Sequence, residues 1–168
     1  SGGIVDFSAC TDERAPELER RVVVSQYLTK LQCTGEIPPQ ETGLTYNSWY
    51  GKPHLEMHWW HGVHFPLWGR PELLEKSLPW YNRVFKKAKH LAERQGFKGA
   101  RWQKMTDPYG DEGPSSVGAF LVWQQPHFIT YAELMYRADS TAATLENYKE
   151  RVFATADFMA SFAHLNEN

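Results

Sequence analysis

The residues from 53 to 65, PHLEMHWWHGVHF, combine four histidines, one glutamate and two tryptophans in a stretch short enough to form one helix. His54, His58 and His61 follow one another at steps of four and three, which places them within about 40° of each other around a helix axis. Imidazoles at this spacing can bind zinc, so a helical metalloprotein is one hypothesis. Glu56 points to the other side of such a helix and the pattern HEXXH is absent, so we predict no metal site.

A histidine in this helix can also have a purely structural role. For His61 and His64, deeper along the helix, we expect hydrogen bonds to neighbouring helices within a packed layer. His54, Glu56 and His58 lie in the first turns, where a polar group can face a cavity and the helix dipole favours an anion. Both a pocket and a structural role fit these three residues. For a pocket, Glu56 and His58 are the candidate catalytic residues and His54 binds substrate.

Aromatic and polar side chains flank this helix in the sequence. The candidates for substrate binding are Tyr46, Trp49, His54, Arg101, Trp102, Glu112, Trp123 and Gln124. Aromatic faces stack on the C–H faces of sugars, and carboxylates and amides pair with hydroxyl groups. This combination fits a neutral polyhydroxylated ligand. Asp111, in the sequence GDEGP, is also typical of a simple turn.

Composition and motifs exclude several classes of function. The formal net charge is -2, with acidic and basic residues mixed along the chain, which argues against a nucleic-acid partner or a polybasic membrane surface. The sequence contains no Gly-rich phosphate loop, no GxSxG elbow and no nucleophilic-cysteine motif, and we expect no cofactor. No apolar run approaches a membrane span, and the N-terminal residues lack the layout of a signal peptide. Cys10 and Cys33 are expected to be free thiols.

The periodicity of apolar residues and the positions of Gly, Pro and capping residues predict five helices and no convincing strand. The expected helices cover residues 16–33, 54–68, 71–95, 117–137 and 144–165. Pro79 marks a kink or a restart capped by Ser77, and Gly69 and Pro71 form a very short connection. The segments 34–53 and 96–116 are long loops, which makes them candidates for a functional role.

The expected helices differ in polarity in an alternating order. The third and fifth carry charges on a broad face, whereas the second and fourth carry almost none. Outer and inner helices therefore alternate as consecutive antiparallel hairpins, which is the pattern of a layered all-α toroid. The long connections enter the inner helices and the short ones leave them. We therefore expect both long loops, and the site, at the N-terminal ends of the inner helices.

Several segments resemble glycosidases and phosphorylases built on six-hairpin (α/α) barrels. YGKPHLEMHWW resembles the segment of the inverting alpha-L-fucosidases in which an Asn-x-Asn pair positions the hydrolytic water, and Glu56 and His58 occupy those two positions. GFKGARW followed by DPYGDE resembles a Gly-Tyr-x-Gly-Ala loop of the maltose and kojibiose phosphorylases, although Pro-Trp-Glu is replaced by Gln103, Lys104 and Met105. GAFLVWQQPHFITYAELMYR resembles an inner helix of the fucosidases.

The resemblance implies a catalytic barrel of twelve helices, whereas this chain contains five expected helices. Residues 1–168 would then be a single helical segment, the first half of the barrel of a periplasmic or extracellular glycoside hydrolase that acts on an oligo- or polysaccharide. Its partners would be a carbohydrate substrate and the remaining half of the barrel or a second copy. The general acid would lie just beyond Asn168, so the chain alone would be inactive. A non-catalytic carbohydrate-binding or scaffold module and a metalloprotein using His54, His58 and His61 are the alternatives.

Overall fold

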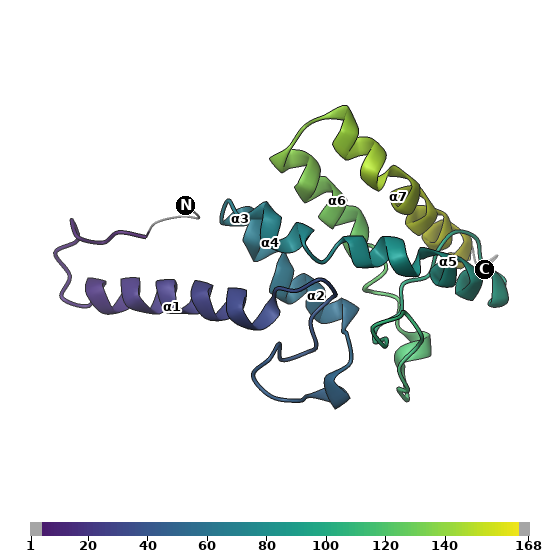
Figure 1. Ribbon diagram of the computed structural model, residues 1–168, viewed down its shortest axis with the longest axis horizontal. Coiled ribbons are helices and arrows are strands. Elements are labelled where there is room, and N and C mark those ends of the chain that lie inside the picture. The colour runs from purple at the N-terminus through teal and green to yellow at the C-terminus, as the bar shows by residue number, and fades with distance from the viewer. Residues whose placement is uncertain (1–4, 165–168) are drawn as a thin grey trace.

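The computed structural model describes residues 5–164, and these residues are mostly helical (Figure 1). The elements are α1 (Ala15–Cys33), the 3-10 helix η1 (Trp49–Gly51), α2 (Leu55–Gly62), α3 (His64–Leu67), α4 (Pro71–Glu75), α5 (Pro79–Arg94), the 3-10 helix η2 (Gly118–Phe120), α6 (His127–Ala138) and α7 (Ala142–Phe162). Within residues 5–164, β pairing is confined to two isolated bridges, His54 with Met105 and Thr106 with Glu112. The all-α class is therefore confirmed for this part of the chain.

Prolines divide two of the expected helices. The helix expected over 54–68 breaks at Val63 into α2 and α3, because Pro66 has no N–H for the carbonyl of Gly62. The restart at Pro79 is confirmed, since α4 ends before it and α5 begins there. Ser77 does not cap α5, however, and its hydroxyl donates to the carbonyl of Leu74.

The helix expected over 117–137 does not form as one element. Only η2 and α6 are helical there, and the chain between them is irregular. Pro126 is the N-cap residue that precedes α6 instead of lying inside the helix, in keeping with the missing N–H of proline. Glu133 and Arg137 of α6 form an exposed ion pair, so this helix has a solvated face that the sequence analysis did not assign to it. The last helix begins at Ala142 rather than at 144 and ends at Phe162, before the expected end at 165, which itself lies outside the described residues.

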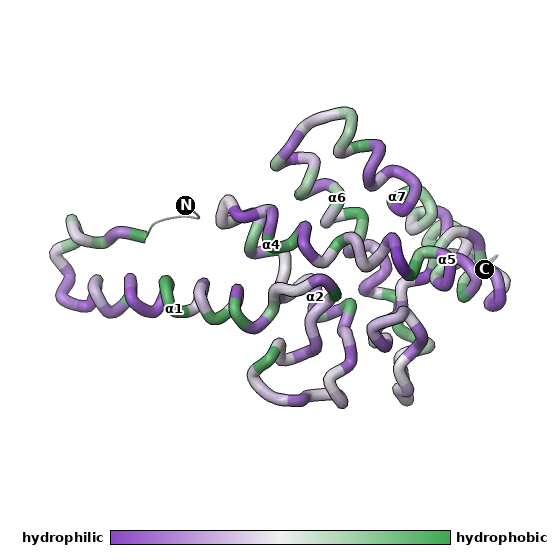
Figure 2. The backbone as a smooth tube through the Cα atoms, viewed as in Figure 1, coloured by the Kyte–Doolittle hydropathy of each residue, from purple (hydrophilic) through white to green (hydrophobic). Residues whose placement is uncertain are grey.

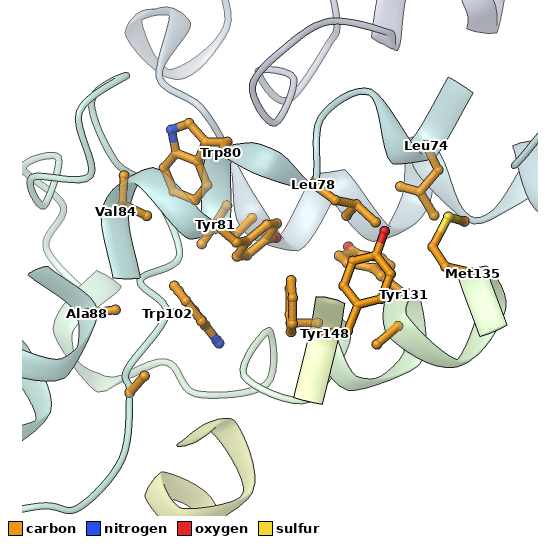
Figure 3. Close-up of a cluster of buried hydrophobic side chains, with 14 of the residues drawn as sticks. Leu74, Leu78, Trp80, Tyr81, Val84, Ala88, Trp102, Tyr131, Met135 and Tyr148 are labelled. Carbon is orange, nitrogen blue, oxygen red and sulfur yellow. The ribbon is translucent and has the colours of Figure 1, made fainter. Parts of the chain in front are cut away.

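The core lies between α2, α5 and α6 and is rich in aromatic rings (Figure 3). Tyr81 of α5 makes an edge contact with Trp102, with ring centres 5.0 Å apart, and a tilted contact with Phe128 at 4.8 Å. Trp102 comes from the second long loop. Gly99 has a φ of 71°, and a Cβ there would lie 2.0 Å from the carbonyl oxygen of Ala154. Glycine thus allows the loop to pass close against α7 and carry Trp102 into the core.

The two long loops meet at the N-terminal ends of α2 and α6, as the pattern of connections predicts. The ammonium group of Lys52 donates to the carbonyl of Pro114, which joins the end of one loop to the end of the other. Nδ1 of His127, the first residue of α6, lies 3.3 Å from the carbonyl oxygen of Leu55, the first residue of α2. Two helix starts and two loops therefore form one region of the molecule.

Helix α1 extends away from this body, whereas α6 and α7 lie side by side and are joined by a short turn (Figure 1). Ala15 is the one residue of α1 that is buried among the described residues. Figure 2 shows hydrophobic segments along the exposed helix. Its exposed large apolar residues are Leu18, Val23, Val24, Tyr27, Leu28 and Leu31.

Candidate functional site

An ion pair between Glu56 and Lys104 lies at the start of α2. The backbone N–H of Leu55 donates to the carbonyl of Lys104 at 2.8 Å, which fixes the second loop beside the first turn of the helix. Lys104 Nζ then lies 3.3 Å from Glu56 Oε2, with the two side chains 15% and 25% exposed. The first turn of a helix also favours an anion. The pair is thus partly shielded from water but still open to a ligand.

Aromatic rings adjoin this ion pair. The ammonium group of Lys104 lies 5.5 Å from the ring centre of Trp123, whose side chain is exposed. Trp59 of α2 packs against the ring of His127 at 4.9 Å. Burial lowers the pKa of His127, while its bond to Leu55 and the charge of Glu56 act in the opposite direction. A flat apolar ring, a carboxylate and an ammonium group are therefore presented together.

His54 is the N-cap of α2. Its Nδ1 accepts a hydrogen bond from the backbone N–H of Met57 at 3.2 Å, and its Nε2 lies 4.0 Å from Glu41 Oε2. Burial and the nearby charge of Lys104 lower the pKa of His54 to about 4. The neutral imidazole thus holds the start of the helix in shape, which gives this predicted substrate-binding residue a structural role.

His58, a predicted catalytic residue, lies in the core with only 2% of its surface exposed. The Ser77 hydroxyl donates its single hydrogen to the carbonyl of Leu74, so Nε2 of His58 must donate to Ser77 Oγ at 2.8 Å. Nδ1 is then the acceptor for the hydroxyl of Tyr81 at 3.1 Å. Burial lowers the pKa of His58 to about 3, so the ring is neutral at pH 7. The structure places His58 beside core tyrosines rather than beside Lys104.

Three predicted substrate-binding residues belong to the scaffold. Trp102 is buried and its indole N–H donates to Thr155 Oγ1 at 2.8 Å. The amide of Gln124 donates to the carbonyl of Trp102 at 2.9 Å. Arg101 donates to Gln95 and to a backbone carbonyl, and burial lowers its pKa. These side chains hold the second loop against α6 and the core.

The remaining predicted residues are exposed, and among the described residues none of them forms a hydrogen bond or an ion pair with Glu56 or Lys104. Tyr46 and Trp49 lie on the surface of the first loop, and Trp49 has a left-handed φ of 49°. Glu112 lines a groove beside α5 together with Gln103. The structure thus brings Glu56, His54 and Trp123 together around Lys104. The sequence did not predict that Lys104 lies beside Glu56 or that His127 contacts Leu55, because both positions depend on contacts between distant segments.

The metal hypothesis finds no support in this geometry. His58 uses both ring nitrogens for protein partners, His61 Nε2 bonds the carbonyl of Glu41 at 2.6 Å, and His54 Nδ1 caps the helix. Residues 5–164 contain no group of three His, Cys, Asp or Glu side chains that could hold a metal ion. In the same part of the chain, no helix is long and apolar enough to cross a membrane.

Comparisons with known proteins assign no family to this chain. No protein family model, curated protein or solved structure matches it. The geometry around Glu56, Lys104 and Trp123 is therefore the only basis for a function in the described residues.

Proposed function

We propose that this chain is a segment of a glycoside hydrolase and that it binds an oligo- or polysaccharide at the start of α2. The observation that carries the proposal is the partly exposed Glu56–Lys104 pair beside the exposed ring of Trp123. A sugar presents C–H faces and hydroxyl groups on the same ring. Trp123 offers an apolar face for the former, and the charged pair offers an acceptor and a donor for the latter.

Glu56 would act on the glycosidic bond by orienting a sugar hydroxyl or the attacking water. Glycoside hydrolysis requires a general acid on one side of the bond and a carboxylate on the other. Lys104 contacts Oε2 of Glu56, so Oε1 is the atom with which a water or hydroxyl would bond. Glu56 supplies one of the two required groups, and the proposal assigns the general acid to another part of the catalytic barrel.

The helical barrel is part of the same proposal, and exposed apolar residues support it. Tyr27 and Leu31 of α1 and Phe153 of α7 are exposed to solvent. Helices of a closed toroid bury such residues against neighbouring hairpins. In this proposal, the other helices of the barrel would cover these faces.

Titration with neutral oligosaccharides, followed by tryptophan fluorescence and calorimetry, tests sugar binding. W123A and E56Q are expected to weaken binding about tenfold or more, because each removes a direct contact. W60A and E133Q are the matched controls, since both residues are exposed and Glu133 lies in a surface ion pair on α6. Equal loss of binding in all four variants, or no binding by the wild type across a panel of hexose and deoxyhexose oligomers, would contradict the proposal.

A non-catalytic carbohydrate-binding module is the second candidate. The direct pairing of Glu56 with Lys104 favours it, because the charge of the carboxylate is already partly balanced. Saturable sugar binding without turnover in the full-length protein would identify such a module. Turnover that E56Q abolishes would identify the hydrolase.

A further inference from the structure

The imidazole of His127 joins the starts of α2 and α6 through one of its two nitrogens. Its Nδ1 lies 3.3 Å from the carbonyl oxygen of Leu55. A carbonyl oxygen can only accept a hydrogen bond, so Nδ1 carries the hydrogen. Burial lowers the pKa of His127, so the ring is mostly neutral at pH 7 and carries a single N–H. Nε2 is therefore an unprotonated nitrogen with a lone pair that can accept.

This Nε2 atom is open to solvent. It forms no hydrogen bond within residues 5–164, and the buried nitrogen and oxygen atoms that lack a partner there do not include it. The His127 side chain as a whole is only partly buried. A ligand can therefore reach this acceptor. The two nitrogens of His58, in contrast, both have protein partners in the core.

Packing holds the His127 ring in one orientation. The ring of Trp59 lies against it, with centres 4.9 Å apart and planes at 34°. Trp59 follows Leu55 by four residues and lies on the same side of α2, one turn further along. Tyr131 of α6 contacts the same imidazole, with ring centres 6.3 Å apart. These two rings and the bond to Leu55 thus preorganise Nε2 before a ligand binds.

His127 belongs to the region around Glu56. Its partner Leu55 directly precedes Glu56 in the first turn of α2. The charge of Glu56 acts on the imidazole and raises its pKa, against the larger effect of burial. Trp123 precedes His127 by four residues, and its ring adjoins Lys104, the partner of Glu56. A neutral nitrogen acceptor therefore stands beside the charged pair and the exposed aromatic ring.

A purely structural role would use only half of this side chain. Joining α2 to α6 requires the N–H of Nδ1 and nothing of Nε2. The open nitrogen is thus the part of His127 that the fold leaves unexplained. It is an acceptor only, whereas the ammonium group of Lys104 is a donor only.

We propose that His127 is a sugar-binding residue whose Nε2 accepts a hydrogen bond from one hydroxyl group of a neutral sugar held between Glu56 and Trp123. This inference rests on the sugar-binding function proposed above. A hydroxyl group can donate or accept, so an acceptor on one side and the donor Lys104 on the other fix the direction of its hydrogen bonds. His127 thereby selects the orientation of the sugar ring and discriminates against a sugar that lacks this hydroxyl.

Two amide substitutions separate the roles of the two nitrogens. The side-chain amide of asparagine lies near the position of Nδ1, and that of glutamine lies near the position of Nε2. H127N thus keeps a donor for Leu55 and loses the acceptor, whereas H127Q keeps an acceptor and loses the donor. The control is H64N, because His64 also packs against a tryptophan, Trp68 at 5.3 Å, but on α3.

Calorimetric titration with maltotriose, cellotriose, mannotriose and a fucosylated trisaccharide measures the effect. For the trisaccharide that binds most tightly, H127N is expected to weaken binding about fivefold to tenfold. H127Q is expected to bind more tightly than H127N, and H64N to stay within about twofold of the wild type. A structural role predicts the opposite order of H127N and H127Q, since only H127N keeps the bond to Leu55.

Nitrogen NMR of the wild-type protein labelled in histidine tests the same bond without a substitution. The His127 signals are identified by their absence in H127N. In the free protein we expect Nδ1 to be protonated and Nε2 to be unprotonated. Addition of the trisaccharide is expected to move the Nε2 resonance upfield, because a lone pair that accepts a hydrogen bond becomes more shielded. A protonated Nε2 in the free protein would refute the inference.

The outcomes distinguish this inference from the function on which it rests. If a trisaccharide binds and both E56Q and W123A weaken it, the sugar site stands. The role of His127 is then refuted if H127N binds like the wild type, if H127Q binds less tightly than H127N, or if the Nε2 resonance does not move. If no trisaccharide binds the wild type, the proposed function fails and the role of His127 fails with it.

Discussion

Gln125 accepts a hydrogen bond from the backbone N–H of Trp102 at 2.8 Å, and its amide nitrogen donates to the carbonyl of Ala100. The side chain of Gln125 thus forms the two hydrogen bonds with the backbone of the second loop that a neighbouring strand would form. It ties the segment that carries Trp102 and Lys104 to the start of α6. The position of Lys104 beside Glu56 depends on this attachment as well as on the bond from Leu55.

Replacement of Gln125 by leucine is expected to destabilise the fold by about 2–3 kcal/mol, because two buried backbone groups lose their partners. The free energy of unfolding in urea, followed by circular dichroism, measures this loss. Q26L is the control, since Gln26 is only partly buried on α1, and a change within about 0.5 kcal/mol is expected there. A Q125L protein as stable as the wild type would show that the loop is held by packing alone.

Local sequence signals predicted the structure correctly where they agreed with the tertiary contacts. Gly69, Pro71 and Pro79 act locally, and the boundaries that they predicted are confirmed. The residues before Pro126 have the composition of a helix, but Gln124 and Gln125 bond to the segment 100–102 and hold that stretch irregular. Local propensity was therefore overridden by contacts that the sequence does not reveal.

The candidate site also depends on contacts between distant segments of the chain. The location of Glu56 in the first turn of a helix, at the meeting point of two loops, followed from spacing and loop length. Its partner Lys104 did not, because the bond between Leu55 and Lys104 joins segments far apart in the chain. His58 lies two residues, or about half a turn, further along and therefore on the other side of α2, where Ser77 and Tyr81 enclose it.

Protonation of His58 is expected to destabilise the protein in mild acid. Burial lowers the folded-state pKa to about 3, against an ordinary value of 6.5. Between these values the unfolded chain binds more protons, so stability is fully present above about pH 6.5 and is lost as the pH falls towards 3. The slope from this residue approaches about 1.4 kcal/mol per pH unit.

Urea unfolding at a series of pH values from 7 to 4 measures this dependence. H58Q has no imidazole to titrate at this position and should show a shallower loss of stability than the wild type. H90Q is the control, because it removes an exposed histidine of α5 instead of a buried one. Parallel curves for wild type and H58Q would show that other groups, such as His54, dominate the acid sensitivity.

The exposed apolar face of α1 is expected to cause association when no other chain covers it. Tyr27 is 60% exposed and Leu31 is 51% exposed, on a helix with little packing against the body. Y27E/L31E should shift sedimentation profiles towards the monomer. L145E, on an exposed apolar residue of α7, is the control. A wild type that remains monomeric at high concentration would contradict the expectation.

This chain by itself is expected to hydrolyse no glycoside. The chemistry requires two groups on opposite sides of the glycosidic bond, and Glu56 supplies at most one of them. The carboxylate of Asp107 stabilises a turn, because its Oδ1 accepts hydrogen bonds from the backbone N–H groups of Tyr109 and Asp111 at 2.8 Å each. Asp111 in turn is paired with Lys87 on the far side of the loop.

A panel of aryl glycosides, with an unrelated active glycosidase as the positive control, measures turnover directly. The expected rate equals that of buffer alone, and E56Q should be indistinguishable from the wild type in this assay while it differs in sugar binding. Turnover by the wild type would show that the second group already lies in this chain. The residue to test would then be Glu41, because its carboxylate lies 4.0 Å from His54 at the same end of α2 and its Oε2 has no hydrogen-bond partner among the described residues. Loss of that turnover in both E41Q and E56Q would identify the pair as the acid and the base. It would also contradict the proposal that the general acid lies in another part of the barrel.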